Sequence, residues 1–318
     1  MSDFEASLII VNWNGAKLID KCLESIEKTC NISMFEVIIL DNDSKEDDII
    51  LIEGFTNKYN RLNLNIIKNG ENLGFGKACN IGAKSAKGKY LVFVNPDTIL
   101  IEDSIKILID DLKNENNVAL VAPKIIDEQL NTSLSPSVFP NILNRIIGGE
   151  SLIRFARILK FKKIGFIYIN LDEASYPDWI VGAFFILPKK IFSDIGGFDE
   201  NIFMYWDEID LCKKIITSGY KVKYNPSTKV IHIGGGTSKA VPQLTIERQM
   251  QSEFYFFKKW NSLEYSIKYT LINAYSSFIK GIIFLLLGYF KNRFKIKSIF
   301  QFDLYKIRMK IVKNNISI

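Results

Sequence analysis

The chain has 318 residues, of which 47% are hydrophobic and 24% are charged, a composition that supports a sizeable core and excludes global disorder. Its net charge of +6 is unevenly spread: residues 258–318 hold 12 basic and two acidic side chains, whereas the preceding residues hold 29 basic and 33 acidic ones. The mildly acidic body argues against a protein that wraps nucleic acid, and the basic tail favours contact with an anionic surface.

Cysteine and histidine usage limits the chemistry further. The chain has four cysteines without C-x-x-C or metal-site spacing, so we expect free thiols in a reducing compartment. Two acids, Asp3 and Glu5, precede the first apolar run, which argues against a secretory signal peptide. His232 is the only histidine, which excludes any mechanism that needs two.

The first 121 residues alternate between short apolar runs and amphipathic stretches. The runs predict strands at 7–11, 35–40, 62–67, 90–94 and 118–121, and the stretches predict helices at 16–28, 46–59, 75–84 and 102–114. Alternation of this kind is typical of βαβ units, in which a mainly parallel sheet carries helices on both faces.

Polar residues follow four of these predicted strands. The stretches are Asn-Trp-Asn-Gly at 12–15, Asp-Asn-Asp-Ser at 41–44, Asn-Gly-Glu-Asn-Leu-Gly at 69–74 and Asn-Pro-Asp-Thr at 95–98. Ligands of open α/β sheets bind at the carboxyl ends of the strands, so these stretches predict one polar pocket. The alternative is that they are only turn residues and helix caps. No P-loop occurs, and Cys79 stands where the third glycine of a dinucleotide fingerprint would be.

The second half of the chain is less regular. We expect a loop at 133–140 and a basic helical stretch at 145–163, which together suggest a flap or an acceptor-side insertion. A buried strand is predicted at 178–187, a helix at 209–216, and two short strands at 221–224 and 229–233, the second reaching His232.

Taken in order, these blocks resemble the family-2 glycosyltransferases of GT-A fold, in particular their rhamnosyltransferase-like branch. The resemblance covers about residues 6–238 and includes IIVNWNG at 9–15, LDNDS at 40–44, NLGFGKACN at 72–80, FVNPDT at 93–98, GA at 182–183, GGFDE at 196–200, WDEIDL at 206–211 and VIH at 230–232. It implies the GT-A fold of nucleotide-diphospho-sugar transferases in residues 1–240. The nucleotide-binding half would be about 1–121 and the acceptor half about 122–240.

The resemblance also implies a donor site for a UDP- or dTDP-type sugar. Asp41 would hydrogen-bond the pyrimidine base, and the segment from Val11 through Asn12 to Asn14 would lie against base and ribose. Asn72 and Lys77 would lie near the nucleotide.

A divalent cation, Mg²⁺ or Mn²⁺, is implied as well. Asp97 takes the position of the last acid of the family's D-x-D motif, where a carboxylate binds the cation together with diphosphate oxygens. Asn95 stands at the position of the first acid of the motif, so the site has one negative charge fewer. We therefore expect Asn95 to lie beside the donor rather than to bind the metal. His232 corresponds to a late histidine that completes the metal site in some members, although a lone histidine after a strand can equally serve as a structural hydrogen-bonding group.

The catalytic pair implied by the resemblance is Asp207 and Glu208. Glu208 falls on the position of the general base and Asp207 on that of its neighbour, in swapped order relative to the family, so the assignment between them stays open. The expected reaction is a single displacement that inverts the anomeric carbon and transfers the sugar to a hydroxyl of a glycan or lipid-linked acceptor in surface polysaccharide synthesis. The alternatives are a non-catalytic nucleotide-sugar-binding subunit and a nucleotidyltransferase.

Residues 241–318 form a basic, helical tail outside the resemblance. The stretch 269–290 is 22 residues long with one charge, Lys280, and a helix of that length is about 33 Å, enough to cross a bilayer. Because Lys280 is central and Phe254, Phe257 and Trp260 flank the stretch, we favour helices that lie on an anionic membrane or pack on the catalytic domain over a true span. A dimer interface is a further possibility. The protein is thus expected in the cytoplasm, peripheral at the inner face of the cell membrane.

Overall fold

The computed structural model describes residues 4–133, 135–143, 163–164, 167–168, 171–234, 242–289 and 292–316. They fall into two compact units. The first comprises Met1–Phe139 with Gly149–Ala240, and the second comprises Pro140–Gly148 with Val241–Ile318.

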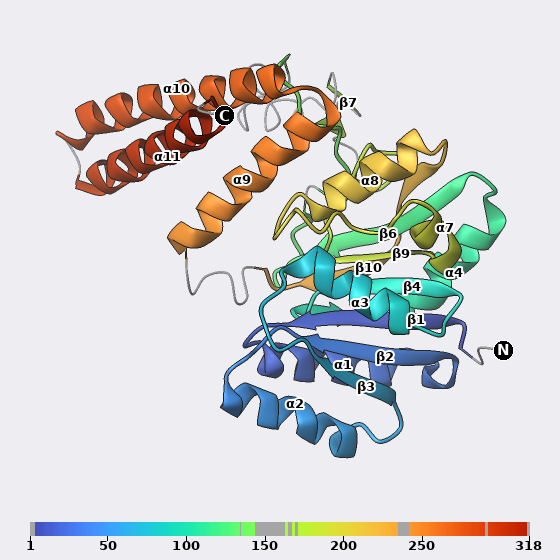
Figure 1. The fold of residues 1–318 in the computed structure, drawn as a ribbon. Coiled ribbons are helices and arrows are strands. Elements are labelled where there is room, and N and C mark those ends of the chain that lie inside the picture. The colour runs from blue at the N-terminus through green and yellow to red at the C-terminus, as the bar shows by residue number, and fades with distance from the viewer. Residues whose placement is uncertain are drawn as a thin grey trace. The chain divides into compact units, whose positions relative to one another are not determined.

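The first unit is built on an eight-stranded sheet with the strand order β3-β2-β1-β4-β9-β6-β10-β5 (Figure 1). Neighbouring strands β3, β2, β1 and β4 are parallel, β6 is parallel to β10, and β9 and β5 run antiparallel to their neighbours. The strands are β1 (Ala6–Asn12), β2 (Phe35–Asp41), β3 (Asn63–Lys68), β4 (Tyr90–Val94), β5 (Thr98–Leu100), β6 (Val118–Ile126), β9 (Phe184–Pro188) and β10 (Lys221–His232). A separate two-stranded pair joins β7 (Lys163–Ile164) to β8 (Ile167–Tyr168).

Helices cover both faces of this sheet, because its central strands are apolar on both sides. Leu8 and Ile10 of β1 belong to the core that includes residues of α1, α2 and α4, whereas Ile9 between them belongs to the core that includes residues of α3 and α8. The helices are α1 (Ala16–Thr29), α2 (Glu46–Lys58), α3 (Phe75–Ser85), α4 (Ser104–Asn114), α7 (Lys189–Asp194) and α8 (Asp207–Thr217). The predicted mainly parallel sheet flanked by helices is confirmed.

Three of the predicted strands differ in detail from the structure. The strand expected at 178–187 begins only at Phe184, because the chain turns at Gly182 and Ala183. The two strands expected at 221–224 and 229–233 are one strand, β10, whose pairing with β6 shifts register between Asn225 and Lys229. The helical stretch expected at 145–163 lies outside the described residues except for Lys163.

The second unit is helical. It contains α9 (Pro242–Trp260), α10 (Leu263–Gly288) and α11 (Asn292–Ile316). Met250 and Phe254 of α9 form a small core with Ile311 of α11, and the ring of Phe257 lies 4.1 Å from that of Tyr269 on α10. The sequence suggested a membrane interface for Phe254 and Phe257, but both are buried inside the protein.

Candidate active site

The ends of β1 and β2 are joined by one polar network. Asn12 and Asp41 are partners in the parallel register, and the side-chain nitrogen of Asn12 lies 2.7 Å from Oδ1 of Asp41 and 2.8 Å from both Ser44 Oγ and Asp48 Oδ2. Asn14 joins the network through its backbone N–H, which donates to Ser44 Oγ at 2.9 Å. Asp41 is only 2% exposed. Its position is therefore set by the protein itself, and its two oxygens keep lone pairs beyond those used here.

A second network orders the loop that follows β3. Asn42 donates to the carbonyl of Gly74 at 2.9 Å and accepts from Asn69 at 2.7 Å, and Asn72 Oδ1 accepts from the backbone N–H of Gly74 at 3.1 Å. The structure thus gives Asn72 a role in shaping the entry to α3. Lys77 lies in the first turn of α3 and is partly exposed.

The glycines at 74 and 76 permit a close approach between two distant segments. A Cβ at Gly74, where φ is +79°, would lie 2.2 Å from the carbonyl oxygen of Phe203, which accepts from the backbone N–H of Phe75 at 3.1 Å. A Cβ at Gly76 would lie 2.8 Å from Oδ1 of Asp207. The Gly-Phe-Gly stretch therefore allows the segment that leads into α8 to pack closely against the start of α3.

Helix α8 begins at the predicted acid pair under local backbone strain. Tyr205 and Trp206, the two residues before it, both have left-handed backbones, with φ of 56° and 65°. Such conformations cost of order 1–3 kcal/mol each for residues other than glycine and concentrate at functional sites. They turn the chain so that Asp207 and Glu208 occupy the first turn of the helix.

The two acids have different surroundings. Asp207 is 2% exposed, and its Oδ1 has no hydrogen-bond partner. Burial, together with the neighbouring Glu208, raises the pKa of Asp207 well above the usual range. The backbone N–H of Gly76 offsets this rise only in part. Glu208 is partly exposed. Burial raises its pKa as well, and the N–H of Gly182 opposes the rise. Gly182 lies against this side chain, since a Cβ there would be 3.2 Å from Cβ of Glu208.

The remaining candidates meet where β5 pairs with β10. Because His232 is opposite Thr98 in this antiparallel pair, its Nε2 lies 3.1 Å from Oδ1 of Asp97 and 3.5 Å from Nδ2 of Asn95. The loop that carries Asn95 and Asp97 is held by the carbonyl of Ala183, which accepts from the N–H of Asn95 at 2.9 Å and from the hydroxyl of Thr98 at 3.1 Å.

Gly182 and Ala183 consequently connect the two clusters. The first touches Glu208 and the second anchors the Asn95–Asp97 loop. The sequence singled out this Gly-Ala pair without a role for it. Asp41 is farther away, at the end of β2, two strands from the end of β4 and thus about 10 Å across the sheet.

The Asp97–His232 pair fits a divalent cation in spacing and chemistry. Two ligand atoms at about 2.1 Å from one octahedral cation, when adjacent, lie about 3 Å apart, which matches the 3.1 Å observed. Within the described part of the chain, no group of three or more histidine, cysteine or acidic side chains gathers into a metal site. These two residues alone would therefore leave most coordination positions to donor oxygens and water.

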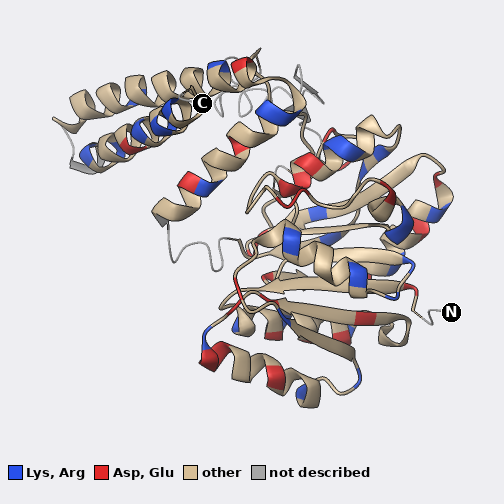
Figure 2. Ribbon diagram, in the orientation of Figure 1, with Lys and Arg blue, Asp and Glu red and all other residues tan. Residues whose placement is uncertain are grey.

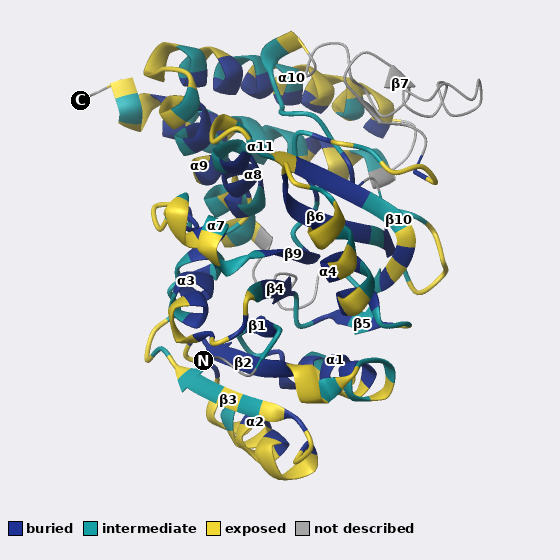
Figure 3. Ribbon diagram, turned by 90° about the vertical axis from the view of Figure 1, so that its right-hand side faces the viewer, coloured by how far each residue is buried: buried dark blue, intermediate teal, exposed yellow. Residues whose placement is uncertain are grey.

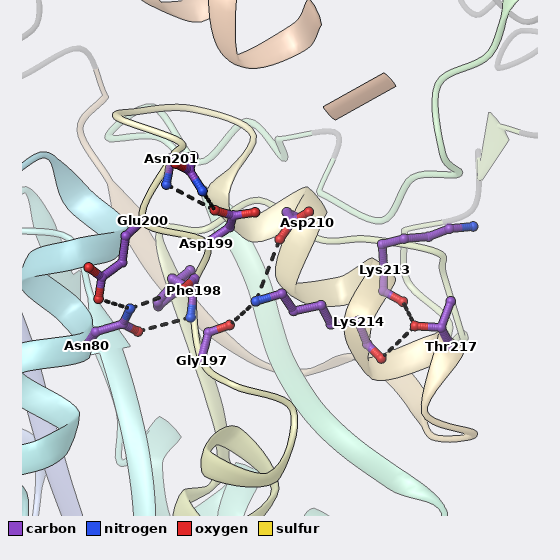
Figure 4. A network of polar contacts seen from close by, with 10 residues as sticks. All are labelled: Asn80, Gly197, Phe198, Asp199, Glu200, Asn201, Asp210, Lys213, Lys214 and Thr217. Carbon is purple, nitrogen blue, oxygen red and sulfur yellow. Dashed lines mark hydrogen bonds and ion pairs between the residues drawn. The ribbon is translucent and has the colours of Figure 1, made fainter. Parts of the chain in front are cut away.

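Sequence reasoning missed the contribution of Asn80 and Lys214. Figure 4 shows Asn80 of α3 directed at Phe198 and Glu200: its amide donates to the Phe198 carbonyl and to Glu200 at 3.1 Å and accepts from the Phe198 N–H at 3.0 Å. Lys214 lies between the Gly197 carbonyl, at 2.7 Å, and the buried Asp210, at 4.0 Å. These contacts fix the 196–200 turn on both α3 and α8. In the sequence, the one indication of these contacts is that Asn80 and the pair Gly196–Gly197 lie within the stretches that resemble the family.

Comparison with known proteins assigns the family. The model of glycosyl transferase family 2 matches residues 7–177, more than half of the chain. The chain belongs to glycosyl transferase family 2, as its sequence motifs predicted.

Among curated relatives, the chain is 25% identical over 260 residues to the rhamnosyltransferase WbbL of Escherichia coli K12, covering 79% of this chain and 92% of that one. It is 24% identical over 185 residues to the N-acetylglucosaminyl-diphospho-decaprenol L-rhamnosyltransferase of Mycobacterium tuberculosis, covering 54% of this chain and 59% of that protein.

Solved structures confirm the GT-A glycosyltransferase fold. The mannosyltransferase PcManGT of Pyrobaculum calidifontis, in complex with GDP-Man and Mn²⁺, superposes with a TM-score of 0.59 at 14% identity and covers 98% of this chain and 87% of that one. GalNAc-T7 with UDP, GalNAc and Mn²⁺ gives 0.57 at 15% identity over 80% of this chain and 50% of that one.

Proposed function

We propose that this glycosyltransferase moves a hexosyl or rhamnosyl unit from a UDP- or dTDP-type donor to a hydroxyl of a lipid-linked or glycan acceptor, with inversion and with a divalent cation, in surface polysaccharide synthesis. The names of two relatives, both rhamnosyltransferases and one specifying a decaprenol-linked acceptor, support the sugar and acceptor class. In this proposal residues 1–240 carry out the chemistry, and the protein works at the cytoplasmic face of the membrane.

The observation that carries the proposal is the position of Glu208. It lies at the start of α8, partly exposed, and is connected through Gly182 and Ala183 to the loop of Asn95 and Asp97. A carboxylate linked in this way to a pair that could hold a cation suits the transfer of a sugar from a nucleotide-diphosphate donor. Asp207 is a poorer base, because it is buried and its raised pKa keeps it protonated over a wider range of pH.

The proposed steps are as follows. Asp41 and Asn12, held by their own network, contact the base and ribose, while Val11, Asn14, Asn72 and Lys77 complete the donor side. Asp97 and His232 would hold the cation, which when bound would offset charge on the departing diphosphate. Glu208 accepts the proton of the acceptor hydroxyl as its oxygen bonds to the anomeric carbon and the bond from that carbon to the diphosphate breaks.

A donor screen tests this proposal. UDP-, dTDP- and GDP-sugars are incubated with the protein, with Mn²⁺, with Mg²⁺ or with chelator, and release of nucleoside diphosphate is followed. We expect release from one donor class, lost on chelation, and reduced about 10²–10⁴-fold by Glu208→Gln, in line with loss of a general base. The control Glu24→Gln changes an exposed acid on α1 and should have no effect. Binding of a donor without turnover, with or without acceptor extract, would instead support a non-catalytic nucleotide-sugar-binding subunit.

A further inference from the structure

The far end of the α10–α11 hairpin, called the hairpin tip below and comprising residues 278–289 and 294–300, exposes an unusual amount of apolar surface. In the described part of the chain, α10 is the one helix long and apolar enough to cross a membrane, yet only 28% of its most apolar 18-residue window is buried. The apolar side chains of the tip that are 39–89% exposed are Phe278, Ile279, Ile282, Ile283, Leu285, Leu286, Leu287, Tyr289, Ile296, Ile299 and Phe300. A patch of this size on a soluble protein marks an interaction site.

The helical packing explains why the apolar surface is at this end. Near its start, α10 is covered by α9, where the hydroxyl of Ser266 donates to the Phe254 carbonyl at 2.7 Å. Toward the tip, α10 contacts α11: Gly281 lies against the ring of Phe302, and the hydroxyl of Ser298 donates to the Gly281 carbonyl at 3.0 Å. Among the described residues, most of the apolar side chains of α10 in the tip are exposed, and Figure 3 shows stretches of α10 in the colour of exposed residues. A helix that is apolar on all sides requires cover.

The charges around the tip indicate what covers it. Residues 265–302 contain six basic side chains and no acidic one. Lys280, Lys295 and Lys297 are exposed beside the apolar residues, and Figure 2 shows basic positions along α11. A symmetric dimer formed through this surface would bring the same cations of two copies together. An anionic lipid surface complements both the apolar residues and the lysines.

A bilayer-spanning α10 fits the structure less well. To cross a bilayer, α10 would have to separate from α11 or insert together with it. Inserting α11 would bring its seven basic side chains and one acidic side chain into the bilayer. Two ion pairs also tie α11 to α9, Arg308 with Glu253 at 2.6 Å and Lys310 with Glu247 at 2.9 Å. The rings of Phe284 and Phe294 stack across the hairpin at 6.0 Å, which keeps the two helices together close to the tip.

We propose that the hairpin tip is a monotopic membrane-docking surface, which lies in the headgroup layer of an anionic bilayer with its isoleucines and leucines in the acyl boundary and its lysines among the phosphates. The long lysine side chains reach upward to the headgroups while their stems stay in apolar surroundings. The surface is independent of the catalytic groups, so this proposal does not depend on the sugar or the acceptor.

Vesicle flotation of the full chain tests the proposal. Vesicles of phosphatidylcholine alone and with 30% phosphatidylglycerol are compared at low and high salt. We expect binding to the anionic vesicles that weakens with salt. Ile283→Ser with Leu286→Ser should reduce it by about 100-fold, from the lost apolar transfer. Lys295→Gln with Lys297→Gln should reduce it by about 30-fold and weaken the preference for anionic lipid.

The matched control places the same change elsewhere. Ile50 and Leu51 of α2 are 60% and 45% exposed, so Ile50→Ser with Leu51→Ser should leave vesicle binding unchanged. Three results would overturn the proposal. The Ile283/Leu286 variant could float with vesicles as well as the wild type does, or the wild type could resist alkaline carbonate extraction, as a protein with a spanning helix does. The wild type could also fail to bind vesicles and form a dimer that the Ile283/Leu286 variant splits. Donor hydrolysis is measured in a separate assay, so the outcome of the vesicle experiment does not decide whether the proposed function is correct.

Discussion

Replacing Asp207 by asparagine should change how the stability of the protein depends on pH. The side chain is 2% exposed, its Oδ1 has no partner, and burial followed by Glu208 raises its pKa well above the ordinary 3.8. The folded protein therefore binds a proton at Asp207 over a pH range in which the unfolded chain has released it. Stability falls with rising pH wherever the folded state holds more protons.

The size of the effect follows from the same linkage. Between the unfolded pKa and the raised folded pKa, Asp207 contributes a slope of about −1.4 kcal/mol per pH unit to the free energy of unfolding. Above the folded pKa this loss is complete. Asparagine cannot ionise, so the variant should lack this contribution and gain stability over the wild type as pH rises.

Urea unfolding of both proteins at half-unit steps from pH 4.5 to 8 measures the difference. Titrating groups that do not interact with Asp207 contribute equally to the two proteins and cancel when the curves are subtracted. We expect the difference to grow as pH rises through this range. Parallel curves over the whole range would show that Asp207 titrates normally in the folded protein, and the account of its burial given above would be wrong.

Three other predictions concern the site. Asp97→Ala should abolish metal-dependent donor binding, whereas Asn95→Ala should weaken it less, because only Asp97 supplies an anion. Calorimetric titration of the donor with and without Mn²⁺ measures this binding, and equal losses in the two variants would contradict the prediction. The rate of transfer should rise with pH as Glu208 deprotonates, with a midpoint above 4.5 because burial raises its pKa, and Glu208→Gln should remove this rising limb; a pH–rate profile that keeps the limb in the variant would assign the base elsewhere. Gly74→Ala should destabilise the protein by at least about 2 kcal/mol more than the control Gly196→Ala. Both glycines have a positive φ, but only at Gly74 would a Cβ lie 2.2 Å from a backbone oxygen. Equal urea midpoints for the two variants would refute the close approach.

Much of the first unit could be predicted from local pattern. The central strands are buried on both faces, so they read as continuous apolar runs, and the helices between them show an apolar stripe. Parallel strands bring their carboxyl ends to one edge of the sheet, which predicts that Asn12 and Asp41 lie together, and the register confirms this. The individual roles of the site residues remain predictions.

Where composition was the only guide, the prediction was less secure. The aromatic residues of α9 looked suited to a membrane interface, but Phe254 and Phe257 are core residues of the helical unit. An aromatic side chain has the same hydrophobicity in both settings, and only the partners that fold against it distinguish them. The exposed apolar residues instead lie at the hairpin tip, where α9 no longer covers α10.

The sequence by itself determined most of the alternating strands and helices of the first unit, the polar strand ends and the acid pair, because each depends on residues close together in the chain. Tertiary structure alone decided which acid is buried and which is partly exposed, since that depends on Gly76 and Gly182, which are distant from α8 in sequence. It also decided that Asp97 meets His232, 3.1 Å apart across a strand pair. Such contacts join residues far apart along the chain, and their distances are set by the packing of whole elements, which no local pattern encodes.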